Sequence, residues 1–98
     1  MDELTSKLEE ARALRNEDEL EASQAILLGL LDRYPDDATV LYEVGGSYDV
    51  LGEERDAIPY YEQAIEAGLA GDDLQECLVC LGSCNRVIGE FEESVKSL

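Results

Sequence analysis

A repeated pattern of large and small residues constrains the fold of this chain more than any other feature. The segment LYEVGGSY at residues 41–48, followed by Leu51-Gly52, aligns with LVCLGSCN at residues 78–85, followed by Ile88-Gly89. Each aligned residue lies 37 positions after its counterpart. A unit of roughly 30–40 residues is typical of an α-solenoid, in which each helix pair buries its apolar face against the next pair. The repeat therefore predicts an all-α fold.

The spacing of apolar residues and helix-breaking residues predicts six helices and no strand. The expected helices are two before Pro35, then Ala38–Val50, about Glu53–Gly68, about Leu74–Val87, and a short last helix from Phe91 onward. They would form three antiparallel pairs, in units of about 2–35, 38–69 and 75–98. With 98 residues, the chain is expected to form a single domain over residues 1–98.

The second unit resembles the tetratricopeptide repeat family, whose pattern spans about 34 residues. The matching residues are Leu41, Val44, Gly45, Tyr48, Ala57, Tyr61 and Ala64, with Pro35 as the terminal proline of the preceding unit. The chain departs from the pattern at Leu69, which occupies the proline site of the second unit, and at Asn85, which replaces the tyrosine. The resemblance implies a right-handed superhelix whose concave surface, lined by the first helix of each pair, holds an extended peptide or a partner helix.

Small residues next to large ones account for the pattern physically. Gly45 and Gly82 would let the two helices of a unit cross closely, and Ala57 and Ala64 would leave room for large neighbours. The residues expected to be buried are Leu41, Val44, Gly45, Tyr48, Ala57, Tyr61, Leu81 and Gly82.

The charge and the absence of histidine narrow the possible functions. Twenty-four acidic residues against seven basic ones give a net charge of -17, so nucleic acid and acidic membranes would repel the chain. Without histidine, the chain lacks the usual general base, the triad base and the commonest metal ligand. We therefore expect a protein that is not an enzyme.

Cys77, Cys80 and Cys84 could indicate a zinc or iron–sulfur site, because thiolates are soft ligands. Their spacing instead places all three on one stripe of a single helix, with neither a fourth cysteine nor a histidine to complete four-coordination. Within the resemblance, Cys77 and Cys84 stand where alanine is common. We expect reduced packing residues and no metal or other cofactor, with a redox or disulfide role as the alternative.

Paired carboxylates offer a second candidate chemistry. The pairs Asp36-Asp37, Glu53-Glu54, Asp72-Asp73 and Glu92-Glu93 each precede or begin an expected helix, where negative charge is favourable. Asp73 and Glu76 have the spacing of a capping box. Helix capping is therefore expected rather than cation binding.

Helical phase, carried over from the resemblance, identifies candidate residues for the concave groove. They are Leu8, Arg12, Arg15, Tyr42, Asp49, Val79, Ser83 and Arg86. Three of the seven basic residues would then face one groove, which suits a partner carrying carboxylates. The alternative is that these arginines balance neighbouring glutamates. The resemblance thus implies a protein or peptide interaction module of unspecified partner.

Self-association is the second functional interpretation. The expected sixth helix is short, so helix five would be incompletely covered, and exposed apolar surface of that kind often marks an interface. The expected homodimer contacts in helices five and six are Val79, Val87, Phe91, Val95 and Leu98. A longer repeat protein, of which this chain is a fragment, would leave the same face open. The acidic first residues and the thiols favour a cytoplasmic location.

Overall fold

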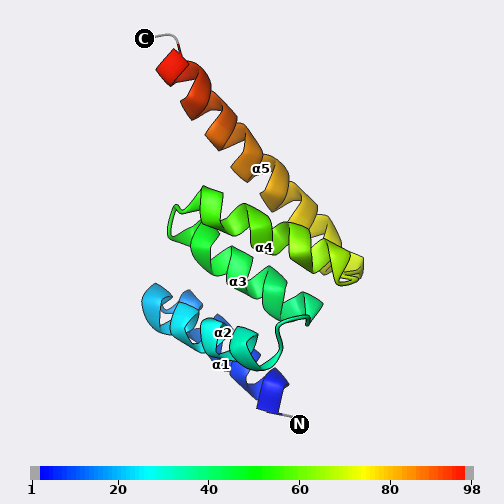
Figure 1. Ribbon diagram of the computed structural model, residues 1–98. Coiled ribbons are helices and arrows are strands. Elements are labelled where there is room, and N and C mark those ends of the chain that lie inside the picture. The colour runs from blue at the N-terminus through cyan, green and yellow to red at the C-terminus, as the bar shows by residue number, and fades with distance from the viewer. Residues whose placement is uncertain (1–2, 97–98) are drawn as a thin grey trace.

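The computed structural model describes residues 3–96, and the side chains of residues 3–89. This part of the chain contains no strand and five helices: α1 (Glu3–Asn16), α2 (Leu20–Arg33), α3 (Ala38–Val50), α4 (Glu54–Glu66) and α5 (Gly71–Lys96) (Figure 1). Each helix packs on the next one along the chain, and α5 also contacts α3. The result is an elongated molecule of 53 × 28 × 22 Å. The all-α prediction is confirmed.

The turn between α3 and α4 forms where the sequence predicts it. Gly52 adopts a φ of 80°, a left-handed conformation that glycine tolerates without strain. The N–H of Glu53 then donates to the carbonyl of Tyr48 at 2.9 Å, which satisfies one of the last carbonyls of α3. At the other end of α3, the carboxylate of Asp37 accepts from the N–H of Val40 at 3.1 Å. The predicted bounds and N-terminal cap of α3 are both confirmed.

The third helix pair is not present among the described residues. The helix α5 continues from Gly71 to Lys96, through the Ile88-Gly89 position where a stop was expected, so the prediction of a separate sixth helix is wrong. Gly89 is not among the glycines with a positive φ. The turn at Gly52 is stabilised by the whole of α4 packing on α3. A break in α5 at Gly89 would lose helical hydrogen bonds that only the packing of a following helix could offset.

Two of the expected capping sites change because of this long helix. Glu92-Glu93 lies within α5 rather than at a helix start. Since α5 already begins at Gly71, Asp73 lies in its first turn and the expected capping box is wrong. Asp72 and Asp73 still place negative charge at the positive end of the helix dipole.

Two adjoining clusters form the core, one on each side of α3. The first lies between α1, α2 and α3, and its buried members are Leu8, Ala11, Leu27, Leu30, Val40 and Val44. The second lies between α3, α4 and α5, and its buried members are Leu41, Ala57, Tyr61, Ala64, Leu69, Cys77 and Cys84. One face of α3 therefore packs against α1 and α2, and the opposite face packs against α4 and α5.

Gly45 lies where α3 and α4 approach closely. A Cβ atom added there would lie 2.8 Å from Cδ1 of Tyr61, which is closer than side chains normally approach. Leu41, Val44, Ala57 and Tyr61 are buried, and so is Gly45, as predicted.

The other predicted core positions differ from expectation. Tyr48 and Leu81 are half-buried. Tyr48 stacks on Tyr60 with ring centroids 5.5 Å apart. Gly82 is exposed, and a Cβ atom there would meet nothing within 4 Å. The burial predicted for Gly82 is wrong because no helix among the described residues packs over that face of α5.

Candidate functional site

The first helices of successive units, α1, α3 and α5, border one pocket of about 220 Å³. We call it the groove pocket, and its lining residues are Arg15, Tyr42, Glu43, Gly46, Asp49, Val50, Tyr61, Glu76 and Cys80. Tyr42, Gly46 and Asp49 follow one another at intervals of four and three residues, which places them on one face of α3. Gly46 contributes no side chain, and the guanidinium of Arg15 lies over it, with Nη1 3.4 Å from the place that a Cβ atom would take.

Tyrosines form one side of the groove pocket. The rings of Tyr42 and Tyr61 lie 6.1 Å apart, between centroids, at an angle of 40°. The hydroxyl of Tyr61 donates to Oδ2 of Asp49 at 2.9 Å. This hydrogen bond holds the Asp49 carboxylate in the pocket and links α4 to α3.

The groove pocket is electronegative. Arg15 faces the three carboxylates of Glu43, Asp49 and Glu76. Burial raises the pKa of the Tyr42 hydroxyl well above its ordinary value, and the neighbouring groups of Glu76, Cys80 and Glu43 raise it further. Burial and these neighbouring groups all disfavour ionisation of the Tyr42 hydroxyl. The lining of the groove pocket thus holds more carboxylates than cations.

Arg12 is engaged by a buried carboxylate beside this pocket. Its Nη2 lies 3.2 Å from Oε1 of Glu43, whose side chain is only 5% exposed. Its Nε donates to the same oxygen at 3.4 Å. The alternative interpretation of the arginines, as partners of neighbouring glutamates, is therefore correct for Arg12. Arg15 has no hydrogen bond or ion pair to another described residue.

We expect Arg12→Ala to lower the free energy of unfolding by about 2 kcal/mol, because it leaves the buried Glu43 carboxylate without its charged partner. Arg33→Ala is the matched control. It removes the same charge from an ion pair with Glu3 whose side chains are more than half exposed, and such pairs typically contribute about 0.2–1 kcal/mol. Urea unfolding followed by circular dichroism measures both. Equal effects of the two substitutions would contradict this role of Arg12.

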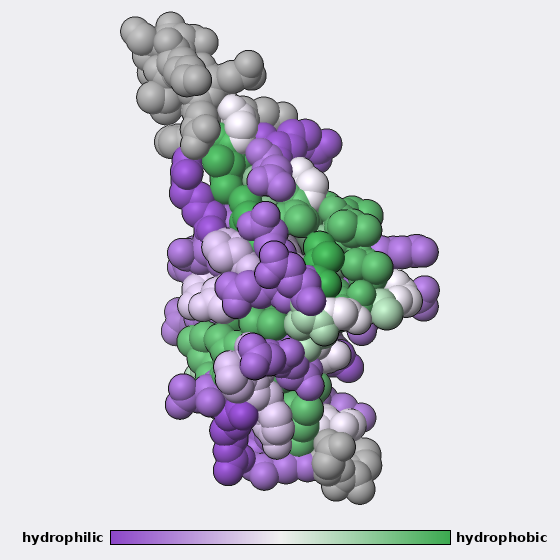
Figure 2. Space-filling view, turned by 45° about the vertical axis from the view of Figure 1, so that its right-hand side comes forward, coloured by the Kyte–Doolittle hydropathy of each residue, from purple (hydrophilic) through white to green (hydrophobic). Residues whose placement is uncertain are grey.

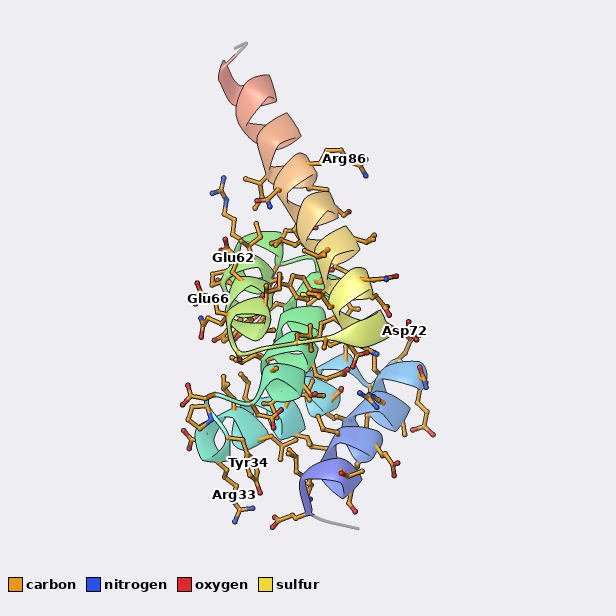
Figure 3. The ribbon with its side chains drawn as sticks, turned by 90° about the vertical axis from the view of Figure 1, so that its right-hand side faces the viewer. Arg33, Tyr34, Glu62, Glu66, Asp72 and Arg86 are labelled. Atoms are coloured by element: carbon orange, nitrogen blue, oxygen red, sulfur yellow. The ribbon has the colours of Figure 1, made fainter. Side chains whose placement is uncertain are left out.

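The structure brings together only part of the predicted groove. Arg15, Tyr42 and Asp49 line the groove pocket. Leu8 does not, since it is 8% exposed and packs in the core between α1 and α2. Val79, Ser83 and Arg86 are exposed on α5 outside the pocket, and the side chain of Arg86 projects away from the other helices (Figure 3).

The packing of α5 explains why its predicted groove residues are displaced. Cys77 and Cys84 are buried against α4, and the S–H of Cys77 donates to the carbonyl of Tyr61 at 3.7 Å. This contact turns Glu76 and Cys80 toward the groove pocket in place of Val79 and Ser83. The cysteine stripe itself carried the signal, because it marks the buried face of α5 and so fixes the phase of its neighbours.

The thiols have the properties of core residues. Burial raises the pKa of the Cys84 thiol to about 11, and burial also raises the pKa values of Cys77 and Cys80. All three thiols are free. Thiols with raised pKa values are weak nucleophiles and weak ligands at neutral pH.

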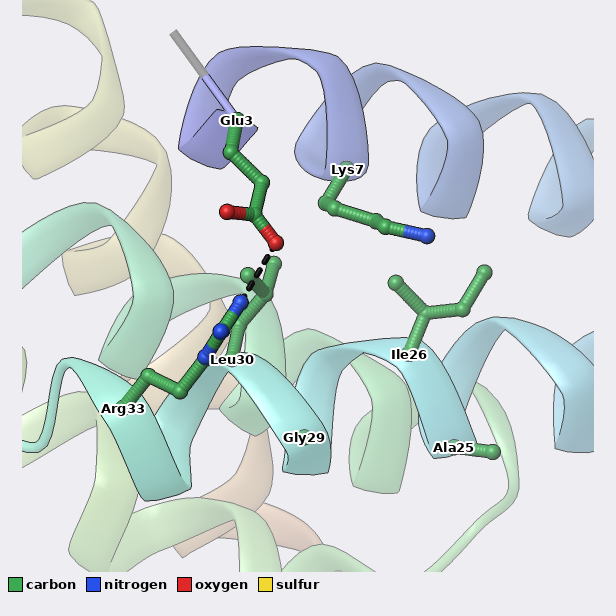
Figure 4. A pocket seen from close by; sticks show the side chains of 7 residues that line it. All are labelled: Glu3, Lys7, Ala25, Ile26, Gly29, Leu30 and Arg33. Carbon is green, nitrogen blue, oxygen red and sulfur yellow. Dashed lines mark hydrogen bonds and ion pairs between the residues drawn. The ribbon is translucent and has the colours of Figure 1, made fainter.

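A second hollow, of about 260 Å³, lies between α1 and α2 (Figure 4). Its apolar lining is Ala25, Ile26, Gly29 and Leu30. The two cations at its edge are already engaged, since Lys7 pairs with Glu10 and Arg33 pairs with Glu3. This hollow therefore offers no unpaired charge to a ligand.

Comparison with known families agrees with the arrangement of α3, α4 and α5. The sequence profile described as Tetratrico peptide repeat matches residues 38–98, which is more than half of the chain. The chain is a tetratricopeptide repeat protein. No curated protein matches the sequence.

Family membership indicates that this tetratricopeptide repeat protein is a protein-interaction scaffold, because these repeats are typically non-catalytic and present extended binding surfaces. None of the helices within residues 3–96 combines the length and the apolarity needed to cross a membrane.

Proposed function

We propose that this protein binds a segment of a partner protein in the groove pocket. The pocket lies between the first helices of successive units, which is the surface expected to be concave in a tetratricopeptide repeat. Tyr42 offers an aromatic face, and the guanidinium of Arg15 lies beside it over Gly46. Aromatic residues in such positions often supply much of the binding energy at protein interfaces.

The chemistry of the groove pocket favours a lysine or arginine side chain in the partner. This differs from the carboxylate ligand expected from three arginines in one groove. Arg12 is engaged by Glu43, and Arg86 lies outside the pocket. Of the three arginines, Arg15 alone lines the pocket, together with the acidic residues Asp49 and Glu76. A cation held by these carboxylates over the ring of Tyr42 would combine ion pairing with a cation–π contact.

One observation carries the proposal: two carboxylates, Asp49 and Glu76, meet beside a half-buried tyrosine in a pocket that has a glycine at its base. Selection of random peptides on the immobilised protein tests it. We expect enriched peptides to contain lysine or arginine, and their affinity to fall as salt is added. Enrichment of acidic peptides, or of none, would contradict the proposal.

Glu76→Gln should lower the affinity for a selected basic peptide by about tenfold, which corresponds to about 1.4 kcal/mol of binding free energy. The matched control is Glu62→Gln, which removes the same charge from the outer surface of α4 (Figure 3). Isothermal titration of both variants separates a local contact from a general effect of the net charge. Equal weakening by the two substitutions would show that the peptide does not contact Glu76.

A second candidate function is self-association through α5. Exposed large apolar side chains gather on this helix: Leu78 is 51% exposed, Val79 71% and Val87 42%. Figure 2 shows hydrophobic surface along α5 at the right of the view. The predicted contacts Phe91, Val95 and Leu98 lie outside the residues whose side chains the structure describes.

The proposal includes no catalytic step, because a chain without histidine lacks the base that most activated nucleophiles require. It also includes a cytoplasmic location. The three free thiols support this location, since unpaired cysteines are typical of reducing compartments.

A further inference from the structure

The groove pocket already contains a guanidinium, which belongs to Arg15. Among the described residues that line this pocket, Arg15 is the only cation. It lies in the last turn of α1 and is half-buried. Its Nη1 lies 3.4 Å from the place that a Cβ atom on Gly46 would take, and the hydroxyl of Tyr61 lies 4.0 Å from the same place. The guanidinium therefore lies within the pocket, over α3.

No polar contact within the described part of the chain holds this guanidinium in place. Arg15 has neither a hydrogen bond nor an ion pair to a described residue, although the carboxylates of Glu43, Asp49 and Glu76 line the same pocket. An arginine side chain that is kept in one conformation also loses rotamer entropy. The Arg15 guanidinium can therefore leave the pocket without breaking a hydrogen bond to these residues.

The position of Arg15 also indicates which chemical group the groove pocket accommodates. A planar guanidinium lies in the pocket, and the other lining groups include the ring of Tyr42 and the carboxylates of Asp49 and Glu76. A guanidinium suits both kinds of neighbour, because it stacks on aromatic rings and pairs with carboxylates through two parallel hydrogen bonds. An arginine of a partner protein presents the same group and fits the same space.

We propose that Arg15 is an internal competitor for the cation position of the groove pocket. An arginine of the partner enters the pocket as the Arg15 guanidinium moves out into solvent. Arg15 thereby determines how tightly the pocket binds a basic segment, because every cationic ligand must replace the cation that the chain itself supplies. This inference rests on the proposed function, since it concerns the same pocket and a basic partner.

The competition has two consequences for affinity. While Arg15 occupies the pocket, a ligand cannot enter, so the apparent affinity is reduced in proportion to the fraction of molecules in which the pocket is free. The exchange of one guanidinium for another also leaves the charge in the pocket unchanged. Removal of Arg15 would leave Asp49 and Glu76 without an opposing cation in the lining and would free the space over Gly46. Both effects favour an arginine of the partner.

Arg15→Ala tests the competition with N-acetylargininamide, a probe that carries one guanidinium and no carboxylate. A titration followed by NMR of the backbone amides measures its affinity. We expect about tenfold tighter binding to Arg15→Ala than to the unsubstituted protein, with the largest shifts at Gly46 and Asp49. Arg86→Ala is the matched control, because it removes the same charge from an exposed position outside the pocket. Its affinity should equal that of the unsubstituted protein.

The side-chain Nε–H resonances of the unsubstituted protein distinguish displacement from a change of charge alone. As the probe is added, the resonance of Arg15 should move toward the position of an exposed arginine. The resonance of Arg12 should stay, because Nε of Arg12 donates to the buried carboxylate of Glu43. An Arg15 resonance that does not move while the amides of Gly46 and Asp49 shift would overturn the displacement.

The outcomes separate this inference from the proposed function. Equal affinity of Arg15→Ala and the unsubstituted protein, with shifts still centred on the groove pocket, would overturn the competition alone. An equal gain of affinity in Arg86→Ala would also overturn it, because the gain would then come from the net charge. Absence of probe binding to all three proteins would overturn both proposals. Circular dichroism checks that Arg15→Ala keeps its helices.

Discussion

Replacement of Tyr61 by alanine is expected to lower the free energy of unfolding by about 4 kcal/mol. Tyr61 is the largest side chain that is fully buried among the described residues, with 1% exposure. Its ring fills the space over Gly45 and packs in the core cluster between α3, α4 and α5. Because a domain of this size has a total stability of about 5–15 kcal/mol, this single change should leave the protein marginally folded.

Tyr61→Phe separates the ring from its hydroxyl. It keeps the buried volume and removes only the hydrogen bond to Asp49, so the expected loss is about 1 kcal/mol. Urea unfolding monitored by circular dichroism at 222 nm measures both variants. A loss below about 2 kcal/mol for Tyr61→Ala would contradict the central packing role given to Tyr61.

Gly45→Ala is expected to lower the free energy of unfolding by about 1 kcal/mol, although alanine is the better helix former. The new methyl group would lie 2.8 Å from Cδ1 and 2.9 Å from Cε1 of Tyr61. The buried ring cannot move away without loss of packing, and such overpacking typically costs about 1–3 kcal/mol. The gain in helix propensity, about 1 kcal/mol, offsets only part of this cost.

Gly29→Ala is the matched control for Gly45→Ala. Gly29 lies in α2, and a Cβ atom there would meet nothing within 4 Å. The substitution should therefore raise the free energy of unfolding by about 0.8 kcal/mol through helix propensity alone. Thermal unfolding of the two variants should shift in opposite directions. Stabilisation by Gly45→Ala would show that α3 and α4 do not approach as closely as the structure indicates.

The local pattern of the second unit was sufficient to predict its structure. The bounds of α3, the cap at Asp37 and the close approach at Gly45 all follow from residues that interact within α3 and α4 or with the core beside them. Turn residues, caps and small residues each specify geometry over a short stretch of chain. The same reasoning predicts the two helices of the first unit.

The same pattern failed in α5 because its outcome depends on tertiary contacts. Ile88-Gly89 permits a turn as Leu51-Gly52 does, but a turn forms only when the following helix gains enough packing to offset the lost hydrogen bonds. Gly82 matches Gly45 in sequence and differs from it in burial for this reason. A repeat thus predicts which residues are equivalent, while burial also requires a neighbour.

The groove could be predicted in part, from residues of α1 and α3. Arg15, Tyr42 and Asp49 lie where the helical phase of the repeat places them. Glu76 and Cys80 were missed because α5 is rotated by the packing of Cys77 and Cys84 on α4. The ion pair between Arg12 and Glu43 could not be predicted from the sequence either, since the two residues are 31 positions apart and meet only in the folded chain.

The most direct test of the proposed function is a titration of the isotopically labelled protein with a selected basic peptide, followed by NMR of the backbone amides. The largest shifts are expected at Tyr42, Gly46 and Asp49 in α3 and at Glu76 and Cys80 in α5, and Glu76→Gln should reduce them at equal peptide concentration. Shifts concentrated instead between α1 and α2, around Ile26 and Gly29, would contradict binding in the groove pocket.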